Sequence, residues 1–530
     1  MENMNKTQKN ILYGIFVIAI ILRLWGITHE LNDYHHFRQT YTAAFAKYFY
    51  EYSMNLFFPN LDILNYKNIS EFQLYPYLVA ILYKIFGFHD IIGRVVALLF
   101  SLCNFWLLFL IVKRYYDSIA GLFAAFLFAV LPLSVFYSRV FMLESMMLFL
   151  SLSSVYFAGR WIDSGKTKLM LLAALFSALT LLIKIPTVYI LFPIAFLIFH
   201  KDKWGAFKVI NNYLYLLLSF LPALYWYFLH AKLFPANSIV DQRMAGAYYS
   251  KDAWDYYLTL MRYGNTWKQI FLVSIAEYHM AIAGFLFFLG GVYLKFKALF
   301  QKDPNKKPVA YSSDSWLFFF WMIGFIFFIL GFIAPNLAHE YYQLPIELPL
   351  IAMAAFFLRN VYALYEKQEK SIFEKIGVGF AAILLIAIVP FSINKLKSRL
   401  EQDFFYNKFA EELQKVSKKE DLIIAIDNTP RTEVFYFADR RGYQLIMPGA
   451  FQIILGPNDK EKYINEIESY RKEGAKFFVS PYVELAGFIP WLKEYLDANY
   501  KCHLGCEITK QDVLNKDPKI KGYIYELTSP

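Results

Sequence analysis

Long runs of apolar residues with almost no charge dominate this chain of 530 residues. Two of them, at 317–332 and 381–391, reach about 20 residues with their flanks, which is the length that crosses the hydrocarbon core of a bilayer. Hydrophobic residues make up 58% of the sequence and charged residues 18%, a balance that excludes an ordinary soluble enzyme. The sequence therefore predicts an integral membrane protein.

The apolar runs predict about eleven membrane spans separated by polar breaks. We expect them near 11–27, 92–112, 118–136, 141–158, 168–184, 187–200, 209–229, 278–294, 315–333, 343–358 and 376–393. The first run lacks a small-residue cleavage site and contains Arg23, so we interpret it as a retained span rather than a signal peptide.

The distribution of basic residues predicts the orientation of the spans. With the N-terminus in the cytoplasm, most Lys and Arg of the short loops fall on the cytoplasmic side, and the opposite loops hold little more than Arg139 and Lys184. This orientation sends three longer segments, 28–91, 231–277 and 394–530, to the extracytoplasmic side. We therefore expect a multi-pass protein of the plasma (inner) membrane with an extracytoplasmic C-terminus.

The formal charge of +10 does not indicate a nucleic-acid partner, because the excess lies in loops between apolar runs rather than in one stripe. The sequence has three cysteines, too few for a disulfide framework or a four-thiolate metal site. Cys502 and Cys506 are close enough to pair in an oxidising compartment, but two free thiols fit the spacing equally well.

After residue 393 the sequence changes to mixed charged and apolar residues. Strand-like runs at 421–426, 477–480 and 522–527 alternate with helical periodicity at 404–419 and 460–473. This alternation predicts a small extracytoplasmic α/β domain. We expect two domains, a transmembrane helical bundle at 1–396 and the α/β domain at 397–530, and hence a mainly α fold.

The first outer loop carries a dense polar cluster. Two segments of this loop, 32–52 and 71–88, have the pattern of interfacial helices, and in the first of them an aromatic face turns away from Lys47 and Glu51. Five polar or ionisable residues crowd into seven positions at the exit of the first span, namely Asp33, His35, His36, Arg38 and Gln39. Such a cluster could bind an anionic headgroup and hold a carboxylate for proton abstraction, although solvated loop residues are the plainer alternative.

Other ionisable residues stand near the outer ends of spans. Glu144 lies in apolar sequence with Arg139 close by, and a charge in such a place normally has a partner or a task. Glu71 opens the second interfacial segment, and either acid could instead pair with an arginine or cap a helix. Lys184 is either a snorkelling lysine or an ammonium that meets a lipid-linked phosphate.

A further polar group stands at the mouth of a late span. It consists of His339, Glu340, Tyr341, Tyr342 and Gln343. Searches for a phosphate-binding loop, a dinucleotide fingerprint, a zinc-protease motif, a serine-hydrolase elbow and an acidic metal triplet find none. We therefore expect no cofactor and no metal. A divalent ion is possible but unsupported, because His35 and His36 are adjacent rather than at a helical spacing that favours metal binding.

Several of these segments resemble a known family. The loop at 33–46, the segments EFQLYPYLVAILYKIFG and GRVVALLFSL, and the motifs SRVFMLESMMLFLSL and HEYYQLP are similar to bacterial and archaeal members of glycosyltransferase family 39. This family includes protein O-mannosyltransferases and aminoarabinose transferases that act on lipid A, and the resemblance spans about residues 10–360. It implies the C-type glycosyltransferase fold, a sugar donor on polyprenyl phosphate, and inverting transfer on the extracytoplasmic side.

The resemblance also implies roles for individual residues. Glu71 and Glu144 match acids of the family, and Lys184 resembles the lysine of a Lys-Pro element near the donor phosphate. Arg38 and Gln39 stand where better-known relatives carry an Asp-Glu pair that includes the base, so the chain departs from the family there.

We therefore expect a transferase whose base is Asp33, with Glu71 and Glu144 as the next candidates. Arg38, Lys184 and Arg139 would offset the charge of the leaving phosphate. A third set would bind the sugar or the acceptor: His35, His36, Gln39, His339, Glu340, Tyr341, Tyr342 and Gln343. The acceptor is a lipid, a glycan or a protein. Two alternatives stay open, a transporter or flippase for lipid-linked sugars, and a sensor or assembly protein with an outer binding domain.

Overall fold

The computed structural model describes residues 4–65, 71–230, 233, 251–303, 307–427, 431–446, 457–481, 489–508 and 522–527. The chain divides into two compact units. The first, the helical unit, comprises Met1–Thr28, Ser70–Tyr75 and Ile91–Leu400. The second, the α/β unit, comprises His29–Ile69, Pro76–Asp90 and Glu401–Pro530. The first outer loop thus shares a unit with the C-terminal segment, so these units do not follow the sequence order of the two predicted domains.

The helical unit contains the apolar helices of the chain. Its α-helices are α1 (Lys6–Leu24), α4 (Asp90–Tyr115, whose first residue belongs to the other unit), α5 (Ser118–Val130), α6 (Pro132–Phe136), α7 (Glu144–Ser164), α8 (Thr167–Ile183), α9 (Leu191–Asp202), α10 (Ile210–Leu224), α13 (Lys251–Arg262), α14 (Gly264–Trp267), α15 (Ala283–Phe300), α16 (Leu317–Gly331), α17 (Ile333–Ala338), α18 (Glu347–Glu366) and α19 (Ile372–Arg399). Short 3-10 and π segments join them: η1 (Ile185–Ile190), η2 (Lys203–Lys208), η3 (Tyr225–His230), η5 (Lys268–His279), η7 (Asp314–Trp316) and η8 (Glu340–Ile346).

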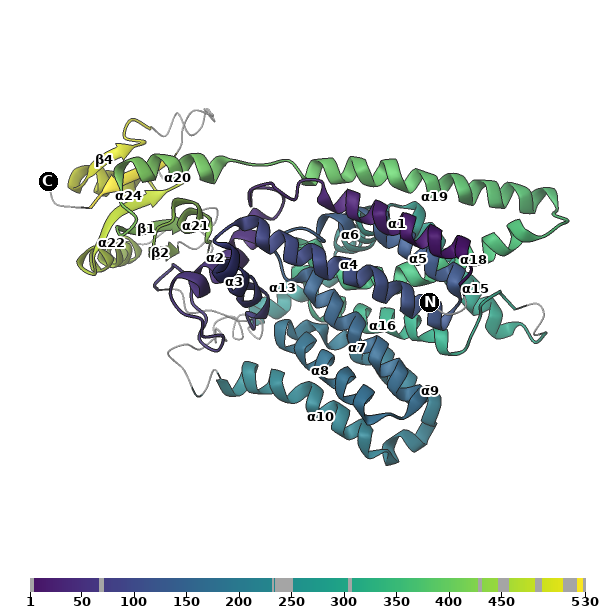
Figure 1. The fold of residues 1–530 in the computed structure, drawn as a ribbon. Coiled ribbons are helices and arrows are strands. Elements are labelled where there is room, and N and C mark those ends of the chain that lie inside the picture. The colour runs from purple at the N-terminus through teal and green to yellow at the C-terminus, as the bar shows by residue number, and fades with distance from the viewer. Residues whose placement is uncertain are drawn as a thin grey trace. The chain divides into compact units, whose positions relative to one another are not determined.

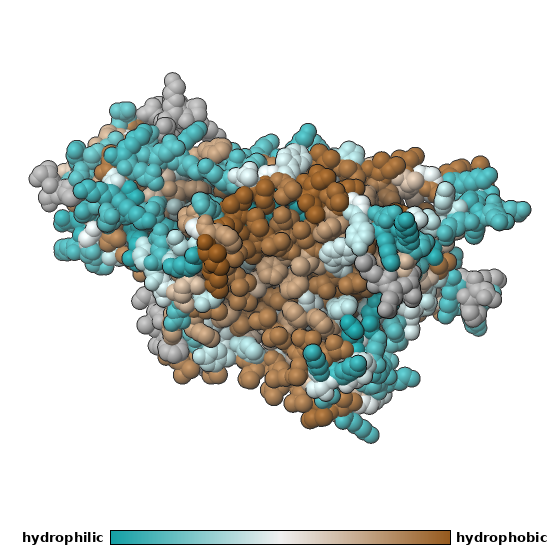
Figure 2. Space-filling view, in the orientation of Figure 1, coloured by the Kyte–Doolittle hydropathy of each residue, from teal (hydrophilic) through white to brown (hydrophobic). Residues whose placement is uncertain are grey.

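The predicted helical membrane protein is confirmed. Among the described residues, eight helical segments are long and apolar enough to cross a bilayer, and the predicted spans at 118–136 and 168–184 form shorter apolar helices. The remaining predicted span, at 141–158, falls on α7. Large apolar side chains such as Ile21, Leu217 and Ile386 are exposed on these helices, as expected of lipid-facing positions. Figure 2 shows a broad hydrophobic area on the visible face of the helical unit, with hydrophilic side chains toward its edges.

Packing within the helical unit brings sequence-distant segments together. Helices α7, α8 and α10 run side by side, and α18 packs against α5 and α15 (Figure 1). A buried apolar cluster joins α6, η8 and α19 through Phe136, Leu344 and Leu396. This packing holds the polar ends of α7, α8 and α18 in one region of the unit.

The α/β unit is built on a five-stranded mixed sheet. Its elements are α2 (His36–Glu51), α3 (Leu74–Phe86, whose first two residues belong to the helical unit), α20 (Phe405–Val416), β1 (Leu422–Asp427), α21 (Glu433–Ala438), β2 (Gly442–Ile446), α22 (Pro457–Lys472), β3 (Ala475–Ser480), α24 (Pro490–Asn499), β4 (Lys501–Leu504) and β5 (Tyr523–Glu526). The strand order is β2-β1-β3-β5-β4. Strands β2, β1 and β3 are parallel, and β5 pairs antiparallel with β3 and β4.

The core of this sheet is apolar on the expected strands. Ile424, Phe478 and Tyr525 are buried between the sheet and helices α22 and α24. The predicted strands at 421–426, 477–480 and 522–527 and the predicted helices at 404–419 and 460–473 are all confirmed within a few residues. Cys502 and Cys506 form a disulfide, which settles a pairing that their spacing left open.

The first outer loop adds to the edge of the sheet. Ile63 forms a parallel bridge with Gly442 in β2, the Gly442 N–H donates to the Asp62 carbonyl at 3.0 Å, and the Gly442 carbonyl accepts from Leu64 N–H at 2.7 Å. On its other side Gly442 pairs with Ile423, where an added Cβ would lie 1.8 Å from the Ile423 carbonyl oxygen. A glycine is therefore required here, because backbone approaches from both sides.

Candidate active site

A buried ion pair joins helix α7 to the end of helix α8. Lys184 Nζ donates to Glu144 Oε1 at 3.1 Å, and both side chains are almost completely buried. Glu144 is the first residue of α7, where the helix dipole favours a carboxylate, and Lys184 follows the last residue of α8. Lys184, and not the nearby Arg139, is thus the ion-pair partner of Glu144.

Two tyrosine rings face the ammonium of this pair. Lys184 Nζ lies 4.4 Å from the ring centre of Tyr342 and 5.3 Å from that of Tyr341, distances typical of cation–π contacts. The helical unit therefore brings together four of the residues that the sequence nominated: Glu144, Lys184, Tyr341 and Tyr342.

The second oxygen of the Glu144 carboxylate has no hydrogen-bond partner among the described residues. A buried ionised group is costly unless it is paired and hydrogen-bonded, and an unsatisfied buried oxygen typically costs about 1–3 kcal/mol. A site that keeps such an oxygen is ready to accept a hydrogen bond from a hydroxyl group of a ligand. The adjacent ammonium and phenol rings offer a positive charge and aromatic surface at the same place.

The backbone that carries the two tyrosines is held by a second buried network. The Glu340 side chain accepts hydrogen bonds from Tyr137 at 2.9 Å and from Arg399, and the Glu340 carbonyl oxygen lies 3.2 Å from His279 Nε2. His279 Nδ1 lies 2.7 Å from Glu347. Glu340 is the first residue of η8, and contacts to both its side chain and its backbone hold this end of η8 in place.

The part of this second network around Glu347 is buried in the helical unit. Ser134 donates to the second oxygen of Glu347, and neither Glu347 nor His279 has any exposed surface. His279 thus lies between the Glu347 carboxylate and the Glu340 carbonyl oxygen. A buried polar network supports the segment that faces Lys184.

Three other candidate residues from the sequence, His339, Gln343 and Arg139, also belong to the helical unit. His339 stacks on Tyr341 with ring centres 5.2 Å apart, and Gln343 donates to the Asn336 carbonyl at 2.6 Å. Arg139 is fully buried and donates to the Gly26 carbonyl at 3.0 Å.

Glu71 lies just before helix α3, which begins three residues later. Its carboxylate interacts electrostatically with the phenol of Tyr227, which donates to the Leu182 carbonyl at 3.0 Å, two residues before Lys184. Tyr75, four residues after Glu71, interacts electrostatically with Glu144. Each of the two acids therefore lies within electrostatic range of a different phenol.

The polar cluster of the first outer loop belongs to the α/β unit. Asp33 is fully buried and accepts a hydrogen bond from the Gln39 amide, which also donates to the Tyr34 carbonyl at 3.1 Å. His35 precedes α2 with a φ of 60°, a left-handed conformation that costs an L-residue roughly 1–2 kcal/mol. This turn directs the chain back so that Gln39, in the first turns of α2, reaches Asp33.

The two remaining residues of the cluster contact different neighbours. His36 Nδ1 lies 3.3 Å from Glu433 Oε1, and Arg38 lies over the ring of Tyr41 at 5.3 Å. Lys47, which the sequence placed on the polar face opposite the aromatic residues of α2, is instead buried between two carboxylates of the α/β unit. The outer loop is therefore part of a folded core rather than a simple surface helix.

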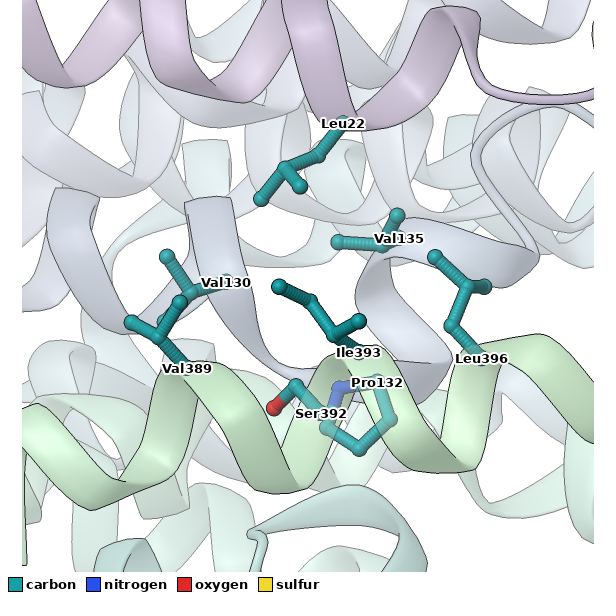
Figure 3. Close-up of a pocket in the computed structure, with 8 residues that line it drawn as sticks. All are labelled: Leu22, Val130, Pro132, Val135, Val389, Ser392, Ile393 and Leu396. Carbon is teal, nitrogen blue, oxygen red and sulfur yellow. The ribbon is translucent and has the colours of Figure 1, made fainter.

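A small apolar cavity lies elsewhere in the helical unit, between α1, α5, α6 and α19. It is lined by Leu22, Val130, Pro132, Val135, Val389, Ser392, Ile393 and Leu396, with the hydroxyl of Ser392 as its polar side chain (Figure 3). Its volume of about 10 Å³ leaves room for about one water molecule, so the cavity is too small for a sugar or a phosphate. We therefore do not place the active site there.

No group of three or more His, Cys, Asp or Glu is positioned to hold a metal ion in the part of the chain that the structure describes. The expected absence of a metal stays a prediction, since this finding concerns the described residues alone.

Sequence analysis missed most of the supporting residues: Ser134, Tyr137, His279, Glu347 and Arg399. A signal existed for Glu347, an acid inside the apolar stretch QLPIELP, and for His279 at the start of a span. Their pairing could not be predicted, because these residues are 68 positions apart and meet only when η5 and α18 pack together.

Comparisons with known proteins give this arrangement a context. The family described as dolichyl-phosphate-mannose-protein mannosyltransferase matches residues 73–226. The structure of ArnT from Cupriavidus metallidurans in the apo state aligns with a TM-score of 0.63 and 10% identity over 99% of this chain and 99% of that one. The chain has a fold like that of ArnT.

Two further solved structures agree with this assignment of the fold. ArnT from the same organism bound to undecaprenyl phosphate aligns with a TM-score of 0.61 and 11% identity, over 97% of this chain and 98% of that one. The Archaeoglobus fulgidus oligosaccharyltransferase aligns with a TM-score of 0.56 and 13% identity, over 94% of this chain and 72% of that one. No curated protein matches the sequence significantly. The predicted fold class and the resemblance noted in the sequence are thus confirmed.

Proposed function

We propose that this protein is a membrane glycosyltransferase that moves a sugar from a polyprenyl-phosphate donor to an acceptor hydroxyl on the extracytoplasmic side, with inversion at the anomeric carbon. The observation that carries the proposal is the buried Lys184–Glu144 pair, whose free carboxylate oxygen and tyrosine-faced ammonium lie in a helical unit of this fold. The match to a mannosyltransferase family and the ArnT structure bound to undecaprenyl phosphate support the same class of donor.

Lys184 supplies the positive charge for the leaving group. As the bond between the anomeric carbon and the phosphate oxygen breaks, charge develops on the phosphate, and an ammonium in a poorly solvated site stabilises it strongly. A hydrogen bond to a charged group typically contributes about 1.5–3 kcal/mol. Glu144 keeps the ammonium in place, and Tyr341 and Tyr342 confine it on the opposite side.

Asp33 is our first choice for the base. It accepts the proton of the acceptor hydroxyl as the oxygen attacks the anomeric carbon, and Gln39 fixes its carboxylate for that task. Glu144 and Glu71 are the next candidates, and their carboxylates differ in environment, because Glu144 is already paired with Lys184. The sugar hydroxyls are bound by His339, Glu340 and Gln343, whose side chains offer both donors and acceptors.

The proposal includes a location and a topology. The excess of Lys and Arg in alternate short loops favours a cytoplasmic N-terminus and an extracytoplasmic C-terminus in the plasma (inner) membrane. The acceptor is a lipid, glycan or protein that reaches the outer leaflet.

The test uses the purified full-length protein and the lipid-linked sugars extracted from source cells that lack it, since these cells accumulate the unused donor. Mass spectrometry follows the release of free polyprenyl phosphate and the gain of one sugar on acceptors in an envelope extract. We expect both products with the wild type and a loss of about a hundredfold or more with Asp33→Asn or Lys184→Met. Movement of intact donor between leaflets without release of polyprenyl phosphate would instead indicate a flippase.

A further inference from the structure

Helix α21 lies along helix α2 inside the α/β unit and contacts it at both ends. At one end Thr432 donates to Thr40 at 3.2 Å, and the Glu433 carboxylate lies 3.3 Å from His36. Thr40, Thr432 and Glu433 are all buried. The first two turns of α2, which include Gln39, therefore rest directly on the C-terminal domain.

At the other end Lys47 connects α2 to the residue that follows α21. Lys47 lies 2.6 Å from Asp439 and 3.0 Å from Asp62, and its side chain is almost completely buried. Lys419 lies 2.8 Å from Asp439 and 3.2 Å from Glu51, the last residue of α2. The contacts span the stretch from residue 36 to residue 51, which is about 22 Å of helix.

Glu433 is placed to act on the start of α2. The residue before this helix, His35, makes no capping hydrogen bond with its side chain, and no acidic residue lies in the first turn of α2. A negative charge near the N-terminus of a helix stabilises it by about 0.3–1 kcal/mol at exposed sites and by more where the pair is buried. Glu433, which also pairs with Arg431 at 3.4 Å, supplies that charge from the C-terminal domain, at the point where the chain turns back to bring Gln39 to Asp33.

The segment after α2 is held by the same domain. The backbone of Asp62 and Leu64 pairs with Gly442, and the Asn65 side chain donates to the Gln444 carbonyl at 2.8 Å and accepts from its N–H at 2.9 Å. The segment before α2 is also attached, since the Asp403 N–H donates to the Asn32 carbonyl at 2.9 Å. The loop is therefore fastened before, along and after α2.

We propose that the C-terminal domain is a positioning device for the first outer loop, and that Glu433 is its principal positioning residue, which holds the start of α2 so that Gln39 fixes the Asp33 carboxylate. The inference rests on the proposed function, because it assigns Asp33 to the reaction. It gives the C-terminal domain a role in the transfer step without contact between Glu433 and the substrates.

The test compares Glu433→Gln, which keeps the shape and removes the charge, with Glu468→Gln. Glu468 is a matched control in the same domain, since it accepts from Tyr495 at 2.7 Å and pairs with Arg471 at 2.9 Å, and both partners lie outside α2. In the release assay with extracted lipid-linked sugars we expect Glu433→Gln to lower kcat about tenfold or more with the donor KM nearly unchanged, and Glu468→Gln to leave both near wild type. Equal kcat for Glu433→Gln and the wild type would overturn the proposal.

A cross-link between α2 and the C-terminal domain gives a second test. A general loss of stability would not produce the recovery of activity that this test looks for. Cysteines placed at Thr40 and Thr432, whose hydroxyl oxygens are 3.2 Å apart, should form a disulfide and restore most of the kcat that Glu433→Gln loses. Wild type treated with the same oxidant and reductant controls for the native Cys502–Cys506 bond. A cross-link that forms and restores no activity would contradict the proposal.

Hydrogen exchange separates this proposal from the proposed function. We expect faster amide exchange across residues 36–51 in Glu433→Gln than in wild type or Glu468→Gln, whatever the enzyme transfers. If wild type releases no polyprenyl phosphate, the proposed function fails while exchange still tests the attachment of α2. If wild type is active and exchange in α2 does not change, the positioning role fails alone.

Discussion

At the scale of single residues, the site depends on charges buried where water cannot solvate them. Removing one member of a buried ion pair usually destabilises a protein by about 3–5 kcal/mol, because the other charge is left alone, whereas replacing both by apolar residues is often neutral. Lys184 and Glu144 meet these conditions, since both are buried and each is the other's ionic partner. Substitutions at this pair should therefore affect the stability and the activity of the protein differently.

We expect Lys184→Met to lower the thermal stability of the detergent-solubilised protein by an amount equivalent to about 3 kcal/mol or more. The double variant Lys184→Met with Glu144→Leu should recover most of that stability, because no buried charge is left unpaired. It should nevertheless remain inactive, because the ammonium is missing. Thermal unfolding and the release of polyprenyl phosphate measure the two effects, and an active double variant would show that the pair has only a structural role.

Sequence patterns found the charged ends of this site but not their pairing. Glu144 and Lys184 are candidates for the site because ionisable residues in apolar sequence are costly to bury without a partner or a function. The structure joins the two in one ion pair. Arg139 was the sequence-adjacent candidate partner of Glu144, but the packing of α7 against α8 brings in a residue 40 positions away instead. Local sequence cannot supply that information, because it depends on tertiary packing.

At the scale of elements, Lys47 shows how α2 is attached to the C-terminal domain. Burial lowers the pKa of Lys47, but Asp62 and Asp439 outweigh that effect and hold the pKa above its usual value. The two acids differ. Burial raises the pKa of Asp62 more than Lys47 lowers it, whereas for Asp439 burial is outweighed by Lys419 and Lys47, which lower the pKa.

The two acids should therefore contribute to stability in opposite pH ranges. Asp439, with a lowered pKa, stabilises the fold above its unfolded pKa of about 3.9, and this contribution is lost as pH falls through the folded value. Asp62, with a raised pKa, contributes only below the unfolded pKa, and that contribution is lost as pH rises through the folded value. At about pH 7 we expect Asp439→Asn to lower the Tm more than Asp62→Asn does. The difference between the two losses of Tm should shrink as the pH falls toward about 3.

Thermal scans of the full-length protein across this pH range check the prediction. A larger loss for Asp62→Asn at neutral pH would show that Lys47 relies mainly on Asp62. Lys476 pairs with Asp421 at 2.7 Å elsewhere in the same unit, so Lys476→Met serves as a control that should leave this difference unchanged.

Most elements could be predicted from periodicity, and the exceptions have physical reasons. Strand β2 (Gly442–Ile446) has the sequence GYQLI, with glycine and glutamine in place of the usual β-branched run, and the strand exists because β1 and the outer loop pair with it. Strand β4 is four residues long and partly exposed, so its apolar pattern is weak. The helices of the membrane spans were easier to predict, because every backbone group in lipid must be hydrogen-bonded within the helix.

At the scale of the whole molecule, the two compact units interleave along the chain. The outer loop between the first two spans folds with the C-terminal domain, although more than 300 residues of the helical unit, Ile91–Leu400, separate them in sequence. Sequence order suggested two consecutive domains, because composition reports on solvent environment and not on which segments pack together. The positions of Asp33 and of Lys184 therefore depend on different units.

The proposed topology predicts that the chain end and the loop near Lys306 lie on opposite sides of the membrane. An accessible tag after Pro530 should react with a membrane-impermeant reagent in intact spheroplasts, and a tag at Lys306 should react only after the membrane is opened. The same pattern for both tags would contradict the orientation. Only tagged variants that support growth or sugar transfer at the wild-type level are used, so that misfolded proteins do not affect the result.

The most direct test of the account is whether the helical unit recognises a lipid phosphate through Lys184. Binding of undecaprenyl phosphate and of undecaprenol, which lacks the phosphate, is measured with the full-length protein in nanodiscs. A charged hydrogen bond of about 1.5–3 kcal/mol predicts that wild type prefers the phosphate by about 10-fold to 150-fold, and that Lys184→Met loses this preference. Equal affinity of the wild type for the two lipids, or an unchanged preference in Lys184→Met, would contradict it.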